Sequence, residues 1–413
     1  MACMSAFGHL EKFKDAIESI GAKFVPLDGS ERMMSEEDMA TFMSMPAGLD
    51  TEAFAIKNVF LKAIPDHHRT MQRVFRGFRE KYGTEQPLIF LYDSSFLGVA
   101  PVLLGAPGIR PDHAIGIGLS PFTFASDDTM PFRSGFQPDV SSKSREIHQR
   151  ALNDQKEEPF FKDIHTVFLE VLKSMGVQPP VPSMWDAFGL LPDRLLQLGI
   201  PEFEYPRSDL RPNVKFIGAL PSVGLSEPAL PPWWDDVLAA KKNNKVVVAV
   251  SSGSVDNNPE DLIIPTLKAL KDREDILVIA TLVASENLGS DLDIPSNARI
   301  AKFVPFDILL PHVSILVSNG GYGTVQQALR IGVPMVLAGV GQDKAQTSAI
   351  ADWAGVAINL AARRPAEAGI KRAVVEIIKN PKYREKAAEF ALKYREYDAL
   401  EAVYTTLQEI LSE

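Results

Sequence analysis

The feature that most constrains the fold is a repeated alternation of short apolar runs and helical patterns in the second half of the chain. Each run is rich in Val, Ile, Leu and Ala, and the runs cover residues 245–250, 275–280, 298–304, 313–318 and 334–338. Strands that alternate with helices in this way pair in parallel, with helices on both faces of the sheet. The pattern therefore predicts a doubly wound α/β half. Weaker strand-like runs at 23–27 and 88–92 extend the α/β prediction to the first half.

The chain has 413 residues, and a proline-dense stretch divides it. At roughly 100–200 residues per domain, this length predicts two domains. Prolines are dense between Pro201 and Pro232, and because proline cannot donate to a strand ladder, that density suits a connection between domains. We expect a first domain at residues 1–222, a second at 223–390, and a C-terminal helix at 391–413 that packs back across both.

Composition excludes several classes of function. The net charge is −10, and no Lys/Arg cluster is longer than three, so nucleic-acid binding is not expected. Cys3 is the only cysteine, which excludes an intrachain disulfide and a Cys-based metal site and fits a reducing compartment. The best membrane-span candidate, residues 87–109, is interrupted by Asp93, Pro101 and Pro107. The sequence thus predicts a cytoplasmic protein without stable membrane insertion.

The most informative motif is a strand, a glycine loop and a helix at residues 313–329. The loop contains Gly320, Gly321 and Gly323, which let backbone N–H groups approach a phosphate at the positive end of the following helix, and Thr324 adds a hydroxyl donor. The spacing matches neither a P-loop nor the dinucleotide fingerprint. A tight strand-to-helix turn in any α/β domain would have the same composition, so the motif alone leaves both interpretations open.

Two further polar segments follow predicted strands. The loop at residues 251–254 contains Gly253, and it could face the same ligand as the first loop at the carboxyl edge of the sheet. After the last strand come Gln342, Asp343 and Lys344, whose side chains are suited to hydrogen-bonding the hydroxyls of a sugar beside a phosphate site. A solvated loop remains the alternative for these residues. The 7 histidines show no metal-ligand spacing beyond one adjacent pair, so no metal site is predicted.

The first half offers two isolated candidates. Asp93 stands at the end of an apolar strand-like run, where an acidic residue is more often a cap or a turn residue than a catalytic group. His9 follows Gly8, and a lone histidine is usually structural or exposed. From the residues alone, neither has an assigned role.

Taken in order, these motifs resemble a known family. The succession of residues 319–324, Gly332-Val-Pro334, Asp343-Lys344 and 355–360 resembles the donor signature of nucleotide-sugar glycosyltransferases of the UDP-glucosyl/glucuronosyltransferase type. Residues 203–218 resemble the linker of the microbial and fungal branch of that family. The resemblance covers nearly the whole chain after residue 12.

The resemblance implies two facing Rossmann-like domains of the GT-B type, with an acceptor-binding domain at 1–222 and a donor-binding domain at 223–390. It implies an inverting, metal-independent transfer of a hexose, glucose being expected, from a UDP-sugar to a hydroxyl of a lipophilic small molecule in secondary metabolism. The UDP-sugar is a co-substrate, and no separate cofactor is expected. His9 would be the general base, and Asp93 would orient and stabilise its imidazolium.

The family pattern also implies the donor contacts. They are Gly253, Ser254, Phe303, Asn319, Gly320, Gly321, Gly323, Thr324, Gln327, Gln342, Asp343 and Lys344. Some depart from the family: Asn319 replaces a frequent histidine, and Gln327 replaces a ribose-binding glutamate. Phe303 stands where an aromatic residue stacks on the base, and Lys344 replaces a glutamine.

The start of the chain departs furthest from the family. Gly8-His9 runs almost directly into residues 13–27, so about 25–35 residues, one helix and one strand at usual lengths, are absent. We therefore expect an N-terminal sheet that lacks an early strand and helix. Two hypotheses follow: a working glycosyltransferase, or a catalytically impaired nucleotide-sugar-binding protein of the same fold. A nucleotide-sugar epimerase is a third, which the linker and the 332–344 block disfavour.

Overall fold

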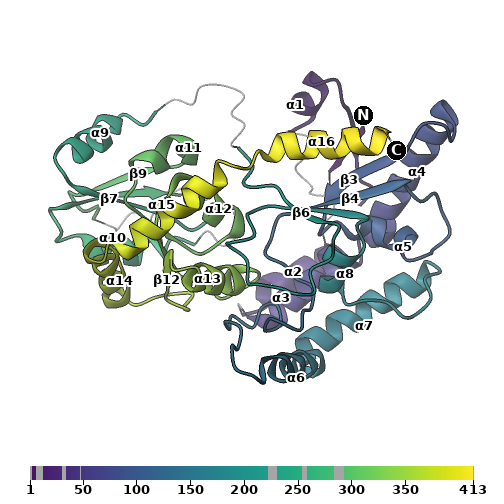
Figure 1. Cartoon of the computed structure of the whole chain (residues 1–413), viewed down its shortest axis with the longest axis horizontal. Helices are drawn as coiled ribbons and strands as arrows, with labels where there is room; N and C mark the ends of the chain where they lie inside the picture. The colour runs from purple at the N-terminus through teal and green to yellow at the C-terminus, as the bar shows by residue number, and fades with distance from the viewer. Residues whose placement is uncertain are drawn as a thin grey trace.

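The structure, a computed structural model, describes residues 2–5, 13–29, 34–46, 48–221, 230–253, 258–282 and 293–412. Two α/β halves lie side by side, and the last helix crosses from the second half to the first (Figure 1). The boundary expected near residue 222 falls at the start of residues 222–229, outside the described residues, and it stays a prediction.

The second half contains one sheet of six parallel strands. Its strands are β7 (Val246–Ser251), β8 (Ile276–Thr281), β9 (Ala298–Ala301), β10 (Ile315–Ser318), β11 (Met335–Leu337) and β12 (Ala357–Asn359). Their order across the sheet is β12-β11-β10-β7-β8-β9, so the chain winds outward in one direction from β7 and in the other direction from β10. This is the Rossmann order, and it confirms the predicted doubly wound half.

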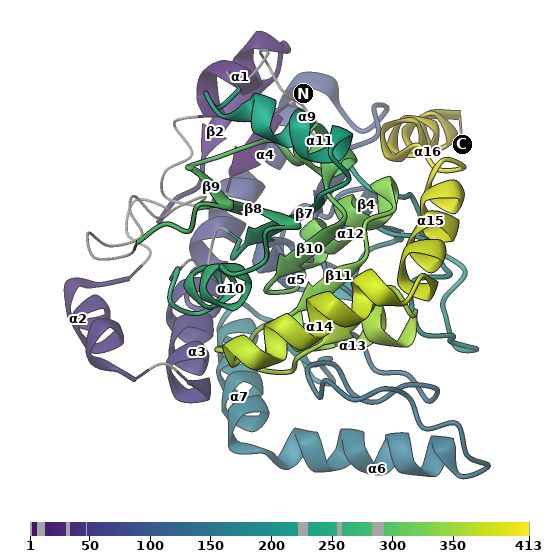
Figure 2. The same ribbon diagram turned by 90° about the vertical axis from the view of Figure 1, so that its left-hand side faces the viewer.

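Helices cover both faces of this sheet, as Figure 2 shows. Because successive side chains of a strand point to opposite faces, Val248 and Val250 of β7 pack with α10 and α14, while Val247 and Ala249 belong to the cluster that includes α12 and α15. The helices of this half are α9 (Trp234–Lys242), α10 (Ile263–Leu270), α11 (Phe306–Leu309), η4 (Leu310–His312), α12 (Tyr322–Ile331), α13 (Lys344–Trp353), α14 (Glu367–Lys379) and α15 (Lys382–Tyr394).

The first half contains a second parallel sheet, with its strands in sequence order. The strands are β3 (Ile89–Asp93), β4 (His113–Gly118), β5 (Arg194–Gln197) and β6 (Val214–Phe216). Met71 and Phe75 of α4 bury against Phe90 of β3. The helices are α1 (Lys14–Ser19), α2 (Glu36–Ser44), α3 (Leu49–Ala55), η2 (Ile56–Leu61), α4 (Ile64–Tyr82), η3 (Leu97–Val99), α5 (Ala100–Leu103), α6 (Ser144–Glu157), α7 (Pro159–Ser174) and α8 (Met184–Leu190).

The first strands of the chain do not join that sheet. β1 (Ala2–Ser5) pairs in parallel with β2 (Lys23–Pro26) in a sheet of their own, and β3 is the edge strand of the four-stranded sheet. Leu91 of β3 is 42% exposed. This arrangement is compatible with a shortened N-terminal sheet, and the absence of an early strand and helix stays a prediction.

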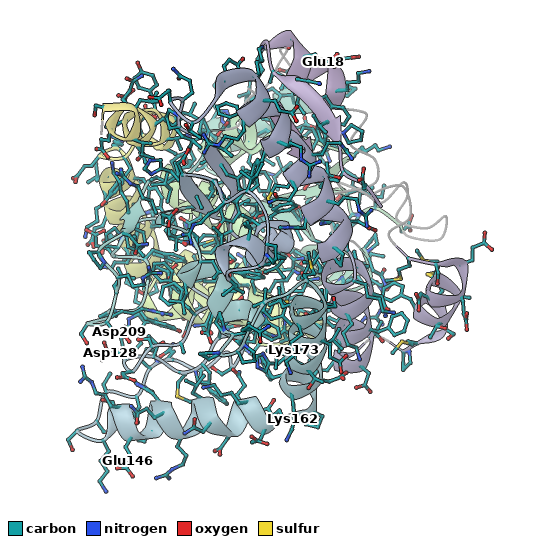
Figure 3. All side chains as sticks on the ribbon, turned by 90° about the vertical axis from the view of Figure 1, so that its right-hand side faces the viewer. Glu18, Asp128, Glu146, Lys162, Lys173 and Asp209 are labelled. Carbon is teal, nitrogen blue, oxygen red and sulfur yellow. The ribbon has the colours of Figure 1, made fainter. Side chains whose placement is uncertain are left out.

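Loops and the last helix tie the first half together. The Asp128 carboxylate accepts a hydrogen bond from the Ser208 N–H, and the Asp209 carboxylate accepts one from the Asp127 N–H at 2.9 Å. Figure 3 labels both aspartates near the base of this half. α16 (Ala399–Ser412) lies over this half, and Glu409 pairs with Arg194 of β5 at 2.9 Å. Among the described helices, none has the length and apolar character needed to cross a membrane.

Candidate functional site

The candidate site lies where the strand order of the second sheet reverses. β7 and β10 are neighbours there, and a ligand of such a sheet binds outside the carboxyl ends of these strands. The two glycine loops follow these strands and contact each other, because the Asn319 side-chain amide donates to the Ser252 carbonyl. Gly253 has a φ of 77°, which favours glycine, and a Cβ there would lie at ordinary contact distance, 3.4 Å, from the Asn319 amide. The fold thus brings together two loops that are distant in sequence.

The glycines after β10 serve different purposes. Gly320 has a φ of 80°, and a Cβ at this position would lie 2.5 Å from the Ser348 hydroxyl oxygen. Gly321 caps α12 and Gly323 lies in its first turn, and neither would place a Cβ within 4 Å of another group. Gly320 therefore shapes the loop, whereas Gly321 and Gly323 leave the N-terminus of α12 open to an anion.

Buried hydroxyls line the same sheet edge. Ser252, Thr281 and Ser348 are at most 2% exposed, and within the described part of the chain their hydroxyls have no hydrogen-bond partner. Buried polar groups are nearly always partnered, so three unpartnered hydroxyls near this edge of the sheet are unusual. Ser252 lies in a loop that the sequence singled out. Thr281 ends β8 and Ser348 lies on α13, and no motif pointed to either.

The residues after β11 close the site from another side. The Asp343 carboxylate accepts a hydrogen bond from the Tyr322 backbone N–H at the start of α12, and burial raises its pKa. Gln342 has a φ of 54°, and its side-chain oxygen accepts a hydrogen bond from the buried Lys344 ammonium group. The structure therefore places Gln342, Asp343 and Lys344 beside the glycine loop.

The remaining donor candidates lie around this centre. Thr324 is half-buried in the first turn of α12. The Gln327 amide donates to the Leu220 carbonyl at 2.6 Å, so this side chain holds the connection between the halves. Phe303 is 63% exposed after β9, which leaves its ring accessible for stacking. The donor-binding roles of these residues stay predictions.

Asp93 lies at the carboxyl end of β3 and is exposed. Its Oδ1 accepts hydrogen bonds from the Ser95 N–H at 2.9 Å and the Ser95 hydroxyl at 2.8 Å. This is the turn role that the sequence alone favoured, and it is compatible with a second role toward a substrate. His9 and Ser254 lie outside the described residues, so the His9–Asp93 pair stays a prediction.

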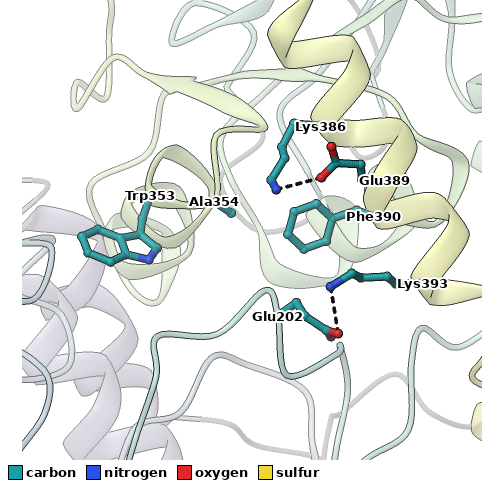
Figure 4. A pocket seen from close by; sticks show the side chains of 7 residues that line it. All are labelled: Glu202, Trp353, Ala354, Lys386, Glu389, Phe390 and Lys393. Atoms are coloured by element: carbon teal, nitrogen blue, oxygen red, sulfur yellow. Dashed lines mark hydrogen bonds and ion pairs between the residues drawn. The ribbon is translucent and has the colours of Figure 1, made fainter.

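A separate cavity of about 370 Å³ lies between the linker and the helices α13 and α15 (Figure 4). Two ion pairs occupy its wall, Lys386 with Glu389 at 2.8 Å and Lys393 with Glu202 at 2.9 Å. Of the described residues that line it, none is a predicted site residue. The described residues also contain no cluster of three or more His, Cys, Asp or Glu side chains that could hold a metal ion.

Two glycine substitutions should separate folding from ligand binding. Gly320→Ala forces a left-handed conformation on a residue whose Cβ would also crowd the Ser348 hydroxyl, and we expect it to lower the free energy of unfolding by at least about 1–2 kcal/mol. Gly323→Ala adds a methyl group to a helical residue in open space, so the variant should fold normally. The methyl group should weaken UDP binding, because it takes up space at the helix N-terminus that is open to an anion. Denaturant unfolding and titration calorimetry measure the two effects. Normal UDP affinity in Gly323→Ala would argue against an anion site at this helix terminus.

Comparisons with known proteins agree with this geometry. Residues 264–397 match the family model "Erythromycin biosynthesis protein CIII-like, C-terminal domain". The chain is 40% identical over 398 residues to UDP-glucosyltransferase avaP of Aspergillus versicolor, covering 94% of this chain and 87% of that protein. It is 31% identical to UDP-glucosyltransferase B1 of Starmerella bombicola, covering 97% of this chain and 90% of that protein.

Solved structures show the same fold. The calicheamicin glycosyltransferase CalG4 superposes with a TM-score of 0.67 at 19% identity, covering 100% of this chain and 91% of that chain. The glycosyltransferase of kitacinnamycin also gives a TM-score of 0.67 at 19% identity, covering 98% and 90%. The architecture of two Rossmann-like halves is thus of the GT-B type, as predicted.

Proposed function

The chain belongs to the UDP-glycosyltransferase family, and on that premise we propose that it transfers glucose from UDP-glucose to a hydroxyl of a lipophilic small molecule. The observation that supports this most is the meeting of both glycine loops with Asp343 at the point where the strand order reverses. The names of relatives as UDP-glucosyltransferases support glucose as the sugar.

The second half would bind the donor. Backbone N–H groups at the N-terminus of α12 would donate to the diphosphate, and the unpartnered hydroxyls of Ser252 and Ser348 are further candidate donors. Such donors stabilise the negative charge that develops on a leaving diphosphate. Asn319 is neutral, and its side-chain amide donates to the Ser252 carbonyl. The negative charge of the leaving diphosphate would therefore be stabilised mainly by backbone dipoles and hydroxyls.

Asp343 would orient the sugar. Its carboxylate already accepts one hydrogen bond from the Tyr322 N–H, and a carboxylate has further lone pairs that can accept from sugar hydroxyls. Gln342 adds an amide next to it. Together these groups would hold the anomeric carbon toward the first half, where the acceptor binds.

The transfer itself would use His9 and Asp93. His9 takes the proton of the acceptor hydroxyl, and the oxygen attacks the anomeric carbon from the face opposite the diphosphate. The bond from the carbon to the diphosphate oxygen breaks, and UDP leaves with the electron pair, so the anomeric configuration inverts. Asp93 would stabilise the imidazolium that forms.

Incubation with UDP-glucose and a panel of phenolic and sterol acceptors tests the proposal. We expect UDP release that requires an acceptor, with a glucosylated product of inverted configuration. UDP-galactose and UDP-glucuronate serve as matched donors, and a faster reaction with either would contradict glucose as the sugar. The impaired alternative predicts UDP binding without turnover on any acceptor, and the comparisons give it no support.

A further inference from the structure

Tyr322 occupies an unusual place in the glycine loop. It lies between Gly321 and Gly323, yet its side chain is only 2% exposed, because it inserts between the two halves. Its hydroxyl oxygen lies 2.7 Å from the Leu198 carbonyl oxygen and 3.0 Å from Glu204 Oε1. Both partners belong to the first half and the segment that follows β5. A residue of the donor loop is thus held by groups more than a hundred positions away.

The partners form a defined socket, made of Gln197, Leu198, Gly199 and Glu204. Gln197 ends β5, and its amide donates to the Ser120 carbonyl at 2.7 Å and to the Tyr322 hydroxyl at 3.2 Å. Gly199 has a φ of 101°, and a Cβ at this position would lie 2.8 Å from the Tyr322 hydroxyl oxygen. The socket therefore admits the hydroxyl only because residue 199 is glycine.

The backbone of Tyr322 is engaged on the donor side, since its N–H donates to the Asp343 carboxylate. One residue thus links the glycine loop, Asp343 and the end of β5. We propose that Tyr322 is a positioning residue: its anchorage in the socket of the first half fixes the glycine loop and Asp343 in the geometry that binds the nucleotide-sugar. The proposal rests on the proposed donor site.

The hydrogen bonds of the socket depend on one proton. The Tyr322 hydroxyl has a single proton, so it cannot donate to the Leu198 carbonyl and to an ionised Glu204 at once. When Glu204 is protonated, its carboxyl can donate to the Tyr322 oxygen, and Tyr322 donates to Leu198. When Glu204 is protonated, the Leu198 carbonyl and the Glu204 carboxyl can therefore both form a hydrogen bond with the Tyr322 hydroxyl. When Glu204 is ionised, only one of the two can.

Charged and titratable groups surround Glu204 on several sides. Arg207 and Tyr205 lie on its own segment, Tyr322 faces it from α12, and Tyr394 faces it from α15. Burial raises the pKa of Glu204 to about 7, and the charge of Arg207 opposes this rise. The anchorage should accordingly weaken as pH rises through neutrality.

Tyr322→Phe tests the proposal, because it removes the hydroxyl and keeps the ring, whose centroid lies 6.2 Å from that of Phe203. Loss of the anchoring hydrogen bonds should weaken UDP binding about tenfold by titration calorimetry at pH 6.5. Tyr394→Phe is the matched control. It removes another buried hydroxyl, which contacts Gln326 farther along α12, and UDP affinity should change less than about twofold.

A second readout separates positioning from a merely structural role. The UDP affinity of the wild type, divided by that of Glu204→Gln, should fall between pH 6.5 and pH 8. The ionisation of UDP affects both affinities equally, so it does not change this ratio. A constant ratio, unchanged affinity in Tyr322→Phe, or equal losses in Tyr322→Phe and Tyr394→Phe would overturn the proposal. Wild-type protein that binds no UDP would instead contradict the proposed function on which it rests.

Discussion

Replacement of Asp93 by asparagine is expected to lower kcat by roughly 10²- to 10⁴-fold, the usual range for the loss of a general acid–base element. Asparagine keeps the Oδ1 that accepts from Ser95, so the turn after β3 is preserved. It removes the negative charge that would stabilise the His9 imidazolium. Since Asp93 lies in the first sheet and the two glycine loops follow strands of the second, UDP affinity should stay near that of the wild type.

Ser95→Ala is the matched control for this variant. It removes the 2.8 Å hydroxyl contact to Asp93 and leaves the charge, so we expect only a few-fold change in kcat. Steady-state kinetics with calorimetric UDP binding distinguishes the two variants. Asp93→Asn with a kcat close to the wild-type value would show that Asp93 is only the turn residue that its bonds to Ser95 suggest.

A second large effect is expected in stability rather than activity. Glu204 is buried, and its pKa is raised from 4.5 to about 7 by that burial. The folded state thus holds this proton more tightly than the unfolded state, so the stabilising contribution is complete below pH 4.5 and is lost as pH rises to about 7. Relative to Glu204→Gln, the wild type should lose about 2–3 kcal/mol of unfolding free energy between pH 5 and pH 8.

The comparison with glutamine is informative because both proteins share every other titrating group. The Glu204→Gln substitution can raise or lower the free energy of unfolding by an amount that does not depend on pH. Only the wild type has the carboxyl whose ionisation produces the pH dependence. Glu202→Gln is the control: this neighbour is paired with Lys393, which lowers its pKa, so its removal should leave the pH 5–8 profile unchanged (Figure 4). Parallel stability profiles for wild type and Glu204→Gln would contradict an ionisable, buried Glu204.

Much of the second half could be predicted because its signals are local. The apolar runs predicted β7, β8, β10 and β11 nearly to the residue, since each strand is buried on both faces and reads as a continuous apolar segment. The glycine loops were visible because glycines that directly follow an apolar run stand out in the sequence. β9 ends at Ala301 instead of reaching residue 304, because it is an edge strand whose single neighbour β8 ends at Thr281, the residue opposite Ala301.

The interactions that hold the site could not be predicted in this way. Tyr322 is a spacer between glycines in the sequence, and its partners Gln197 and Glu204 are 125 and 118 positions away. Thr281 and Ser348 are ordinary polar residues until the sheet order brings β8 and α13 to the same edge. Such contacts follow from the packing of the two halves, for which neither periodicity nor local spacing carries a signal.

The central claim is that this chain is an active UDP-sugar transferase, and the most direct test is the rate of UDP release from UDP-glucose with and without a lipophilic acceptor alcohol or phenol. We expect release that depends on the acceptor and is matched mole for mole by a glucosylated product. The rate should fall in Gly323→Ala through weaker donor binding and in Asp93→Asn through kcat. If the protein binds UDP tightly but releases no UDP from UDP-glucose with any acceptor, the account is contradicted.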